Sequence, residues 1–323
     1  MLKKCPNCHS DDTKKRGKER GIQTYSCNIC GRRFRNERRE KTDLEKELWD
    51  KYIFGKQTVR ELSRDYGMDK RVVREILEKY KAPEKTHTPR KINLIADAFY
   101  LGERLEHTSW CPLVFRDPKR KEDVWWDFFN TETTIAYEQG RKALDALGYE
   151  IKSITGDGFS GIRQAFSGIP YQMCHVHMER IVIAGTTRKP QLEAGRALLA
   201  LVKTLHQDID SKKFKIYLTK YLERYRDFLN EKTILIDGTS VWTHDGVRSA
   251  TLSLVKFFPY LFTFERHKDI PKTTNSLEGH FSHVRDIIGV HRGLKRPQME
   301  KVLNTIFLAS SIAPTEKKLK YVL

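Results

Sequence analysis

The feature that most narrowly limits the fold is the order of apolar segments between residues 91 and 174. Three strand-like runs come first, then a long helix-like segment, then a strand, a short helix and a last strand. In chain order they are KINLIADAFYLG, WCPLVFRD, DVWWDFFN, TETTIAYEQGRKALDALG, IKSIT, GFSGIRQAF and IPYQMC. The order βββαβαβ predicts a mixed sheet, with antiparallel strands first and parallel strands later.

This order is that of a ribonuclease H-like core, in which the first strand lies beside the fourth. Asp97 interrupts the first apolar run, and Asp157 directly follows the fourth strand. The two carboxylates would therefore meet, although 60 residues separate them. Taken singly, Asp97 can also be a hydrogen-bonded strand residue, and Asp157 a turn residue before glycine.

A third acidic residue, Glu278, lies in the helix-like segment KTTNSLEGHFSHVRDIIG. Thr273, Thr274 and Asn275 are suitable residues to cap its start. Helical spacing puts four side chains on one face: Asn275, Glu278, Ser282 and Arg285. On that face Glu278 would reach a metal and Arg285 a DNA phosphate. Three carboxylates from distant segments suit two Mg²⁺ ions about 4 Å apart, which clamp the oxygens of a phosphodiester.

The interval between Asp157 and Glu278 is 121 residues, too long for one strand and one helix. Residues 190–232 have the periodicity of long amphipathic helices. We therefore predict an all-helical insertion at 185–269 that divides the catalytic domain into 92–184 and 270–323. The fold class is multidomain α/β, with a βββαβαβα core interrupted by this insertion.

Two Cys-x-x-Cys pairs mark the N-terminal segment: Cys5, Cys8, Cys27 and Cys30. Each pair forms a tight turn, and four thiolates can bind one structural Zn²⁺ tetrahedrally. We predict a zinc ribbon at residues 1–40, whose basic loops touch DNA phosphates. The alternative is a ribbon that mediates protein contacts.

Residues 41–82 have the pattern of a helix-turn-helix domain, followed by a linker at 83–91. Gly67 makes the turn and Asp69 caps the second helix of the motif. The exposed side near the start of that helix, where base contacts are made, would carry Lys70, Arg71 and Arg74. The alternative is a plain helical hairpin with a basic face.

The net charge of the 323-residue chain supports a polyanionic partner. It is +18, and residues 1–91 supply +11 of it, with 26 Lys and Arg against 15 Asp and Glu. Nucleic acid is the commonest partner of such a segment, although a solvated basic surface gives the same composition. No apolar run approaches the ~20 residues of a membrane helix, and the start of the chain is unlike a signal peptide. We therefore expect a cytosolic protein without a membrane partner.

Several motifs together resemble the DDE transposases of the Mutator-like superfamily. Within it the chain is most similar to the IS256-type insertion-sequence enzymes, in the branch that begins with a zinc ribbon. The resemblance spans nearly the whole chain and rests on an ordered set: Asp97, Asp157 before glycine, CHVH, TTNSLE, and Arg285 seven residues after Glu278.

The resemblance implies an enzyme that binds double-stranded DNA, at transposon terminal inverted repeats and at a target, in the prokaryotic cytoplasm. It implies a homodimer or larger assembly, with two Mg²⁺ or Mn²⁺ ions held by Asp97, Asp157 and Glu278. It also gives functions to Cys174 and His177, the C/D-x-x-H signature, and to Trp242, which resembles a tryptophan that stacks on a displaced base. Asn275 and Arg285 would support the site. His291 and Arg292, which follow the catalytic helix, are further candidate DNA contacts.

Four alternatives stay open. Cys174 and His177 can brace the site rather than act in it, and Trp242 can be a core residue rather than a base-stacking one. The whole chain can be an inactive or domesticated DNA-binding regulator, for which a carboxylate triad has no use. A ribonuclease H-like nuclease would use the same triad without joining DNA.

Overall fold

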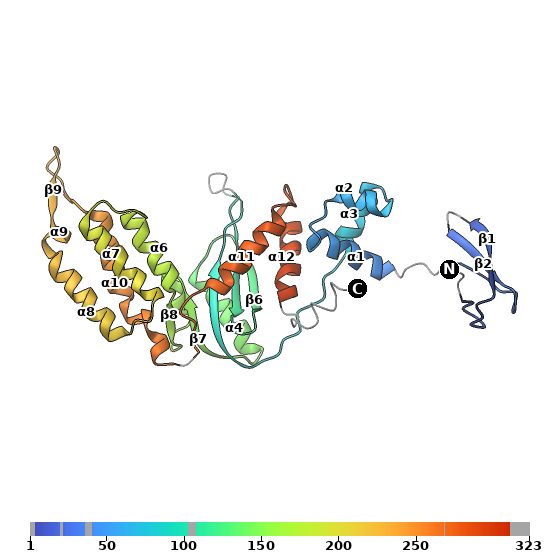
Figure 1. Ribbon diagram of the computed structural model, residues 1–323, viewed down its shortest axis with the longest axis horizontal. Coiled ribbons are helices and arrows are strands. Elements are labelled where there is room, and N and C mark those ends of the chain that lie inside the picture. The colour runs from blue at the N-terminus through green and yellow to red at the C-terminus, as the bar shows by residue number, and fades with distance from the viewer. Residues whose placement is uncertain (1–3, 20–21, 36–40, 103–107, 268, 311–323) are drawn as a thin grey trace. The chain divides into compact units, whose positions relative to one another are not determined.

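The computed structural model describes residues 4–19, 22–35, 41–102, 108–267 and 269–310. The chain forms two compact units, Met1–Lys81 and Ala82–Leu323 (Figure 1). The end of the predicted core segment 270–323, from residue 311 on, lies outside the described residues. Within the described part of the chain, no helix is long and apolar enough to cross a membrane.

The first part of unit 1 is a small antiparallel sheet with the strand order β1-β2-β3. Its strands are β1 (Thr13–Glu19), β2 (Ile22–Cys27) and β3 (Arg33–Arg35). Tyr25 and Phe34 lie opposite each other in the β2–β3 register, with ring centroids 5.6 Å apart. This aromatic pair provides apolar packing for a ribbon too short to have a large core.

Three helices complete unit 1: α1 (Lys41–Ile53), α2 (Val59–Tyr66) and α3 (Lys70–Lys79). Thr58 and Glu61 form a capping box at the start of α2. Gly67 ends α2 with φ +60°, a conformation that glycine adopts without strain, and Asp69 accepts a hydrogen bond from the N–H of Arg71 to start α3. The turn at Gly67 and the cap at Asp69 therefore lie between two helices, as predicted.

Unit 2 contains a five-stranded mixed sheet with the order β6-β5-β4-β7-β8. The strands β4, β5 and β6 are antiparallel neighbours, whereas β7 and β8 run parallel to β4. Their bounds are β4 Lys91–Ala98, β5 Cys111–Asp117, β6 Glu122–Phe129, β7 Glu150–Gly156 and β8 Tyr171–Met173. This is the strand order of a ribonuclease H-like core, and it confirms the predicted fold class.

Helices cover both faces of this sheet. On one face, α4 (Thr134–Ala146) packs so closely that a Cβ added at Gly140 would lie 2.6 Å from the rings of Phe115 and Trp125. The next residue on β6, Trp126, points to the opposite face and contacts Phe307, 5.6 Å away between centroids. That second face is covered by α11 (Asn275–Ile288) and α12 (Arg296–Ser310).

A helical bundle leads from the end of β8 to the region before α11 (Figure 1). Its helices are α6 His175–Thr186, α7 Glu193–Lys203, α8 Ser211–Arg224, α9 Arg226–Asn230 and α10 Asp245–Leu261. The crossing of α6 and α10 is tight, because a Cβ at Gly185 would lie 2.4 Å from the carbonyl oxygen of Gly246. The apolar core of the bundle is continuous with the core on the α4 face of the sheet.

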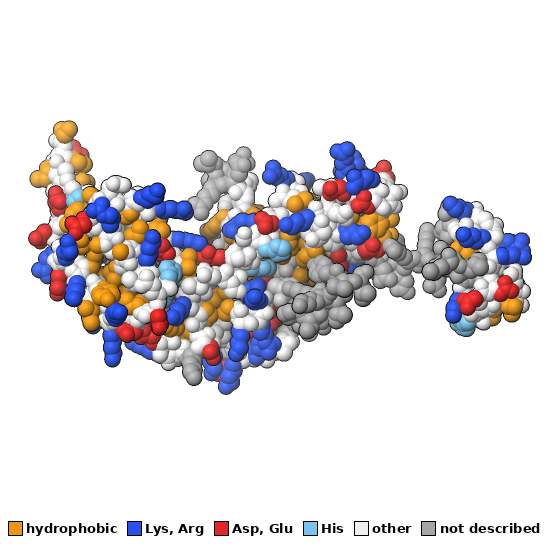
Figure 2. Space-filling model, in the orientation of Figure 1, with side chains coloured by type: hydrophobic (Ala, Val, Ile, Leu, Met, Phe, Trp, Pro, Cys, Tyr) orange, Lys and Arg blue, Asp and Glu red, His pale blue; other side chains and the backbone are white. Residues whose placement is uncertain are grey.

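The expectation of an all-helical insertion needs one correction. Strands β9 (Lys232–Ile234) and β10 (Ser240–Trp242) form an antiparallel hairpin within it. The turn contains Asp237 and Gly238, the latter with φ +80°, and Asp-Gly is a strong hairpin-turn signal. Figure 2 shows hydrophobic side chains at its tip, where Ile234 and Ile236 are exposed.

Candidate active site and metal centres

Two carboxylates lie at the same end of neighbouring parallel strands. The register pairs Ile95 of β4 with Thr155 of β7, so Asp97 and Asp157 come two residues further along each strand. Asp97 is half-buried at the end of β4. Asp157 directly follows β7, where its Oδ1 accepts a hydrogen bond from the N–H of Phe159 at 2.9 Å and orders the turn into α5 (Ser160–Ala165).

Helix α11 brings Glu278 to this edge from the α11 face of the sheet. The buried side chains of Leu277, Phe281 and Val284 anchor the helix. The expected cap is absent, because Thr274, at the N-cap position, makes no capping bond. Its hydroxyl lies instead 3.4 Å from the Cys174 sulfur and 3.4 Å from Nδ1 of His177.

The donor atoms that the structure brings together are not quite the predicted set. One ligand atom each of Asp97, His177 and Glu278 lies within 4.8 Å of the others. Sequence reasoning put Asp157 in this group and gave His177 a supporting role. Asp157 lies close enough for its charge to raise the pKa of Asp97, while one of its oxygens is engaged by its own turn.

An arginine holds Glu278. Arg180 of α6 donates from Nη1 to Oε1 at 2.9 Å and from Nη2 to Oε2 at 2.6 Å. The Arg180 side chain is 55% exposed and that of Glu278 is 23% exposed. Nε2 of His177, one helical turn before Arg180, lies 3.9 Å from the same carboxylate. This fork geometry satisfies both carboxylate oxygens.

Burial and charge shift the pKa values of the site strongly. Burial, together with the charge of Asp157, raises the pKa of Asp97 to about 7. Burial alone would lower the pKa of His177, but the hydrogen bond and charge of Cys174 and the charges of Asp97 and Asp157 raise it to about 9. The raised pKa of Asp97 suits a cation site, because this carboxylate is costly to ionise without a neighbouring positive charge.

A fourth carboxylate, Glu132, was missed by the sequence analysis. It lies just before α4 and accepts a hydrogen bond from the hydroxyl of buried Tyr137 at 2.5 Å. Burial raises the pKa of Glu132, and the charge of Asp157 raises it further. The hydrogen bond from Tyr137 acts in the opposite direction but does not cancel the rise. In the sequence it resembles an ordinary acidic residue near a helix start. Arg180 was missed too, although its position three residues after His177 is a helical-face signal.

The chemistry of these donors fits a divalent cation. Carboxylate oxygens suit Mg²⁺ and Mn²⁺, and Mn²⁺ also accepts an imidazole. Adjacent ligands of an octahedral ion with bonds of about 2.1 Å lie about 3 Å apart, so the ligand atoms of Asp97, His177 and Glu278, which lie within 4.8 Å of one another, would approach when they bind an ion. In this structure Arg180 donates a hydrogen bond to each of the two carboxylate oxygens of Glu278.

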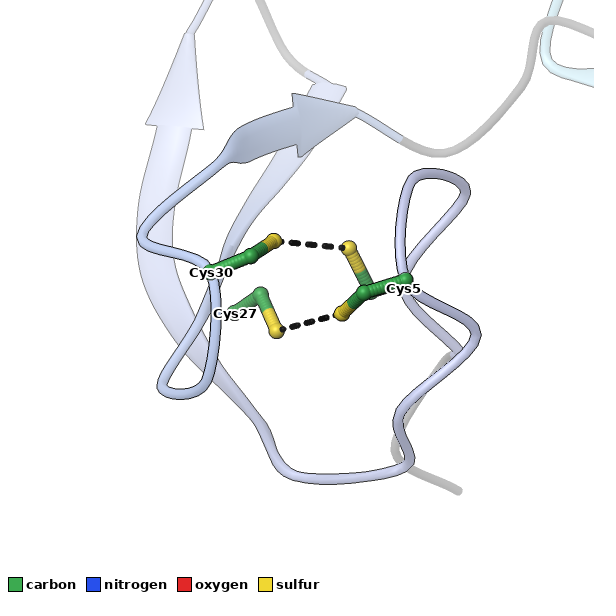
Figure 3. Close-up of side chains that lie close together, drawn as sticks. Cys5, Cys27 and Cys30 are labelled. Atoms are coloured by element: carbon green, nitrogen blue, oxygen red, sulfur yellow. Dashed lines mark hydrogen bonds between the residues drawn. The ribbon is translucent and has the colours of Figure 1, made fainter.

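The four ribbon cysteines form the second candidate metal centre (Figure 3). Sulfur atoms of Cys5 and Cys30 lie 3.6 Å apart, and those of Cys8 and Cys27 lie 3.4 Å apart. Tetrahedral zinc with Zn–S bonds of about 2.3 Å requires sulfur separations of about 3.8 Å. The four thiols therefore fit one zinc ion with no open position.

The predicted DNA contacts on the helix-turn-helix are exposed. Lys70, Arg71 and Arg74 lie in the first two turns of α3, and all three side chains face solvent. Arg71 forms a salt bridge with Glu75, in which Nε of Arg71 lies 3.1 Å from Oε1 of Glu75. Lys70 and Arg74 therefore carry the less compensated charges of this surface.

The other residues that were predicted to contact DNA differ in their exposure. Trp242 is half-buried on β10, and two cations lie close to its ring centroid: the Lys232 ammonium at 4.5 Å and the Arg248 guanidinium at 3.9 Å. His291 is only 4% exposed, because the chain turns back after α11, so its side chain offers little surface for the predicted DNA contact. Its neighbour Arg292 is exposed.

The two supporting residues of α11 are also exposed. Asn275 lies in the first turn of the helix, on the predicted face with Glu278. The guanidinium of Arg285 lies 5.0 Å from the ring centroid of Phe99. A cation–π contact of this kind orients Arg285 while leaving its N–H groups open to solvent.

Comparisons with known proteins give limited similarity. No protein-family model matches the chain, and no curated protein matches it in sequence. The Drosophila P element transposase strand transfer complex is similar in structure, with a TM-score of 0.41, 11% identity, and coverage of 87% of this chain and 94% of that chain. A chain of the simian T-cell lymphotropic virus intasome in complex with PP2A regulatory subunit B56 gamma has a TM-score of 0.21 and 12% sequence identity. This match covers 67% of the present chain and 68% of the intasome chain. Because both TM-scores are low, the fold assignment rests on the strand order.

Proposed function

We propose that this protein is a DDE transposase of an IS256-type insertion sequence, in the Mutator-like superfamily. It would bind transposon ends and catalyse DNA strand cleavage and strand transfer. The observation that supports the proposal is the position of three carboxylates at one end of a ribonuclease H-like sheet. Asp97 and Asp157 lie at the ends of the neighbouring parallel strands β4 and β7, and Glu278 of α11 has a ligand atom within 4.8 Å of those of Asp97 and His177. A protein that only binds DNA has no need of half-buried carboxylates in this arrangement.

The residues that would hold the metal ions are Asp97, Asp157 and Glu278, and His177 lies close enough to Asp97 and Glu278 to share one ion. Two bound Mg²⁺ or Mn²⁺ ions would activate the attacking oxygen and stabilise the leaving one. Asp97 and Asp157, whose positions are fixed by the β4–β7 register, would hold those ions at the end of the sheet. Cys174 and Thr274 fix the ring of His177, and the exposed cations Arg285 and Arg292 bind phosphates of the duplex.

The reaction proceeds in two displacements at one site. The oxygen of water attacks a backbone phosphorus at the transposon end, the P–O3′ bond breaks, and the leaving oxygen takes a proton to become a 3′-hydroxyl. That hydroxyl then loses its proton and attacks a target phosphorus, where a second P–O3′ bond breaks. No covalent protein intermediate is formed, and joining two ends calls for a homodimer or larger assembly.

The test is a strand-transfer assay with Mg²⁺ or Mn²⁺ on DNA that flanks the coding sequence on each side. Asp97→Ala and Glu278→Gln should abolish nicking and joining while retaining DNA binding. The matched control is Asp286→Asn, an exposed carboxylate on the same helix as Glu278, which should remain active. Full activity of the Asp97 or Glu278 variant, or binding of ends without nicking or joining by the unaltered protein, refutes the proposal. Nicking without joining identifies a nuclease instead.

A further inference from the structure

The contact between Arg180 and Glu278 has a consequence for metal binding. Glu278 can bind a cation only through oxygen lone pairs, and Arg180 donates a hydrogen bond to each of its oxygens. A guanidinium and a divalent cation are both attracted to one carboxylate and repel each other. The two therefore compete for Glu278.

The position of Arg180 suits a contact that can be exchanged. Its side chain is 55% exposed and projects from α6, whereas Glu278 is held from behind by the buried face of α11. Release of Arg180 moves only a flexible side chain, and an exposed ion pair contributes only about 0.2–1 kcal/mol. Glu278 can thus exchange partners without movement of either helix.

The charge balance points the same way. Four carboxylates gather around one region: Asp97, Asp157, Glu132 and Glu278. Among the described residues, His177 and Arg180 are cationic partners that face them. Without metal, Arg180 offsets part of the repulsion between these carboxylates. Once a divalent cation supplies that charge, the guanidinium is no longer needed there.

A displaced Arg180 would stay beside the reacting phosphates. The planar guanidinium fork that matches a carboxylate also matches a phosphate. We infer that Arg180 is an exchangeable counter-ion: it occupies Glu278 in the metal-free protein, yields to the divalent cation, and then binds a phosphate of the DNA substrate. This rests on the proposed function, because it takes Glu278 to be a metal ligand.

The exchange links metal and DNA. Metal binding frees Arg180 for the phosphate, and a phosphate that binds Arg180 frees Glu278 for the metal. By thermodynamic reciprocity each ligand raises the affinity for the other by the same factor. Arg180 is a positioning residue in this scheme. The coupling between metal binding and DNA binding distinguishes this role from a purely structural one.

The test measures Mn²⁺ binding to the full chain by calorimetry, without DNA. Arg180→Gln should bind Mn²⁺ more tightly than the unaltered protein, by up to about fivefold, and Arg180→Lys should lie between them. The matched control is Arg224→Gln, which removes an exposed arginine that lies 2.6 Å from Glu193 in the same unit and should change nothing. Glu278→Gln should weaken Mn²⁺ binding at least tenfold. Circular dichroism verifies that each variant is folded.

A second arm measures the affinity for a fluorescent DNA duplex of arbitrary sequence, with and without Mn²⁺. Mn²⁺ should strengthen binding of the unaltered protein severalfold and have no such effect on Arg180→Gln. If Arg180→Gln binds Mn²⁺ equally or more weakly, or keeps the full Mn²⁺ effect on DNA, the exchange is refuted while the proposed function stands. If Glu278→Gln binds Mn²⁺ normally, the proposed function itself fails.

Discussion

Replacing Asp97 by asparagine should stabilise the metal-free protein, although it removes a predicted metal ligand. Burial at the end of β4, together with the charge of Asp157, raises the pKa of the Asp97 carboxyl from 3.8 to about 7. The ionised form is therefore less favourable in the folded chain than in the unfolded chain. Asparagine has nearly the same shape and carries no charge, and its side-chain oxygen can still accept the hydrogen bond from the N–H of Ala98.

The size of the effect follows from the pKa shift. A change of about three units corresponds to about 4 kcal/mol at most, at about 1.36 kcal/mol per unit. Because Asp97 keeps some contact with solvent, we expect a gain of about 2–4 kcal/mol in the free energy of unfolding at about pH 8. Between pH 3.8 and about 7 the folded state binds more protons than the unfolded state, so the stability of the unaltered protein falls as the pH rises. The advantage of Asp97→Asn should therefore grow from near zero at about pH 4 to its full value above about pH 7.

The assay is urea denaturation, monitored by tryptophan fluorescence, in buffer free of Mg²⁺ and Mn²⁺ and without chelator, so that the ribbon keeps its zinc. Trp110, Trp125 and Trp126 report on the sheet that carries Asp97. Asp127→Asn, an exposed change on β6, is the matched control and should alter the free energy by less than about 0.5 kcal/mol.

Two results would refute the reasoning. Equal stability of the variant and the unaltered protein at about pH 8 would show that ionised Asp97 is not disfavoured in the folded state. A gain of the same size at every pH would point to packing rather than charge. Added Mn²⁺ should narrow the difference, because it stabilises the folded state of the unaltered protein more than that of the variant.

Three further predictions concern other parts of the chain. Cys8→Ser should lower the zinc content from near one ion per chain, measured by mass spectrometry, and unfold the ribbon alone; a folded metal-free ribbon would contradict the zinc site. Burial lowers the pKa of His175, so the free energy of unfolding should fall as the pH drops below about 6.5, and His175→Gln should lose that part of the dependence in urea titrations at about pH 5.5 and 7.5. Trp242→Ala should weaken binding of a DNA end with an unpaired base by about 1–3 kcal/mol, measured by anisotropy, and leave binding of a fully paired duplex unchanged.

Local structure could be predicted from the sequence, because it depends on residues that are close together in the chain. The Cys-x-x-Cys turns, the cap at Asp69 and the turn at Gly67 depend on side chains and backbone within a few residues. The order of the strands in unit 2 was predictable for a related reason, since the periods of apolar residues distinguish strands from helices. The hairpin of β9 and β10 was missed because its short strands lie among helix-like segments, although its Asp-Gly turn was visible.

The sequence by itself determined which carboxylates lie at the ends of strands and on the face of a helix. Only the tertiary structure decided which side chains meet there. His177 and Arg180 reach Glu278 because α6 and α11, about 100 residues apart, approach at the end of the sheet. His291 is buried because of the path the chain takes after α11. Such contacts depend on how whole helices and strands pack against one another. The periodicity of one helix predicts which of its faces is buried, but it does not predict which residue of a distant helix lies against that face.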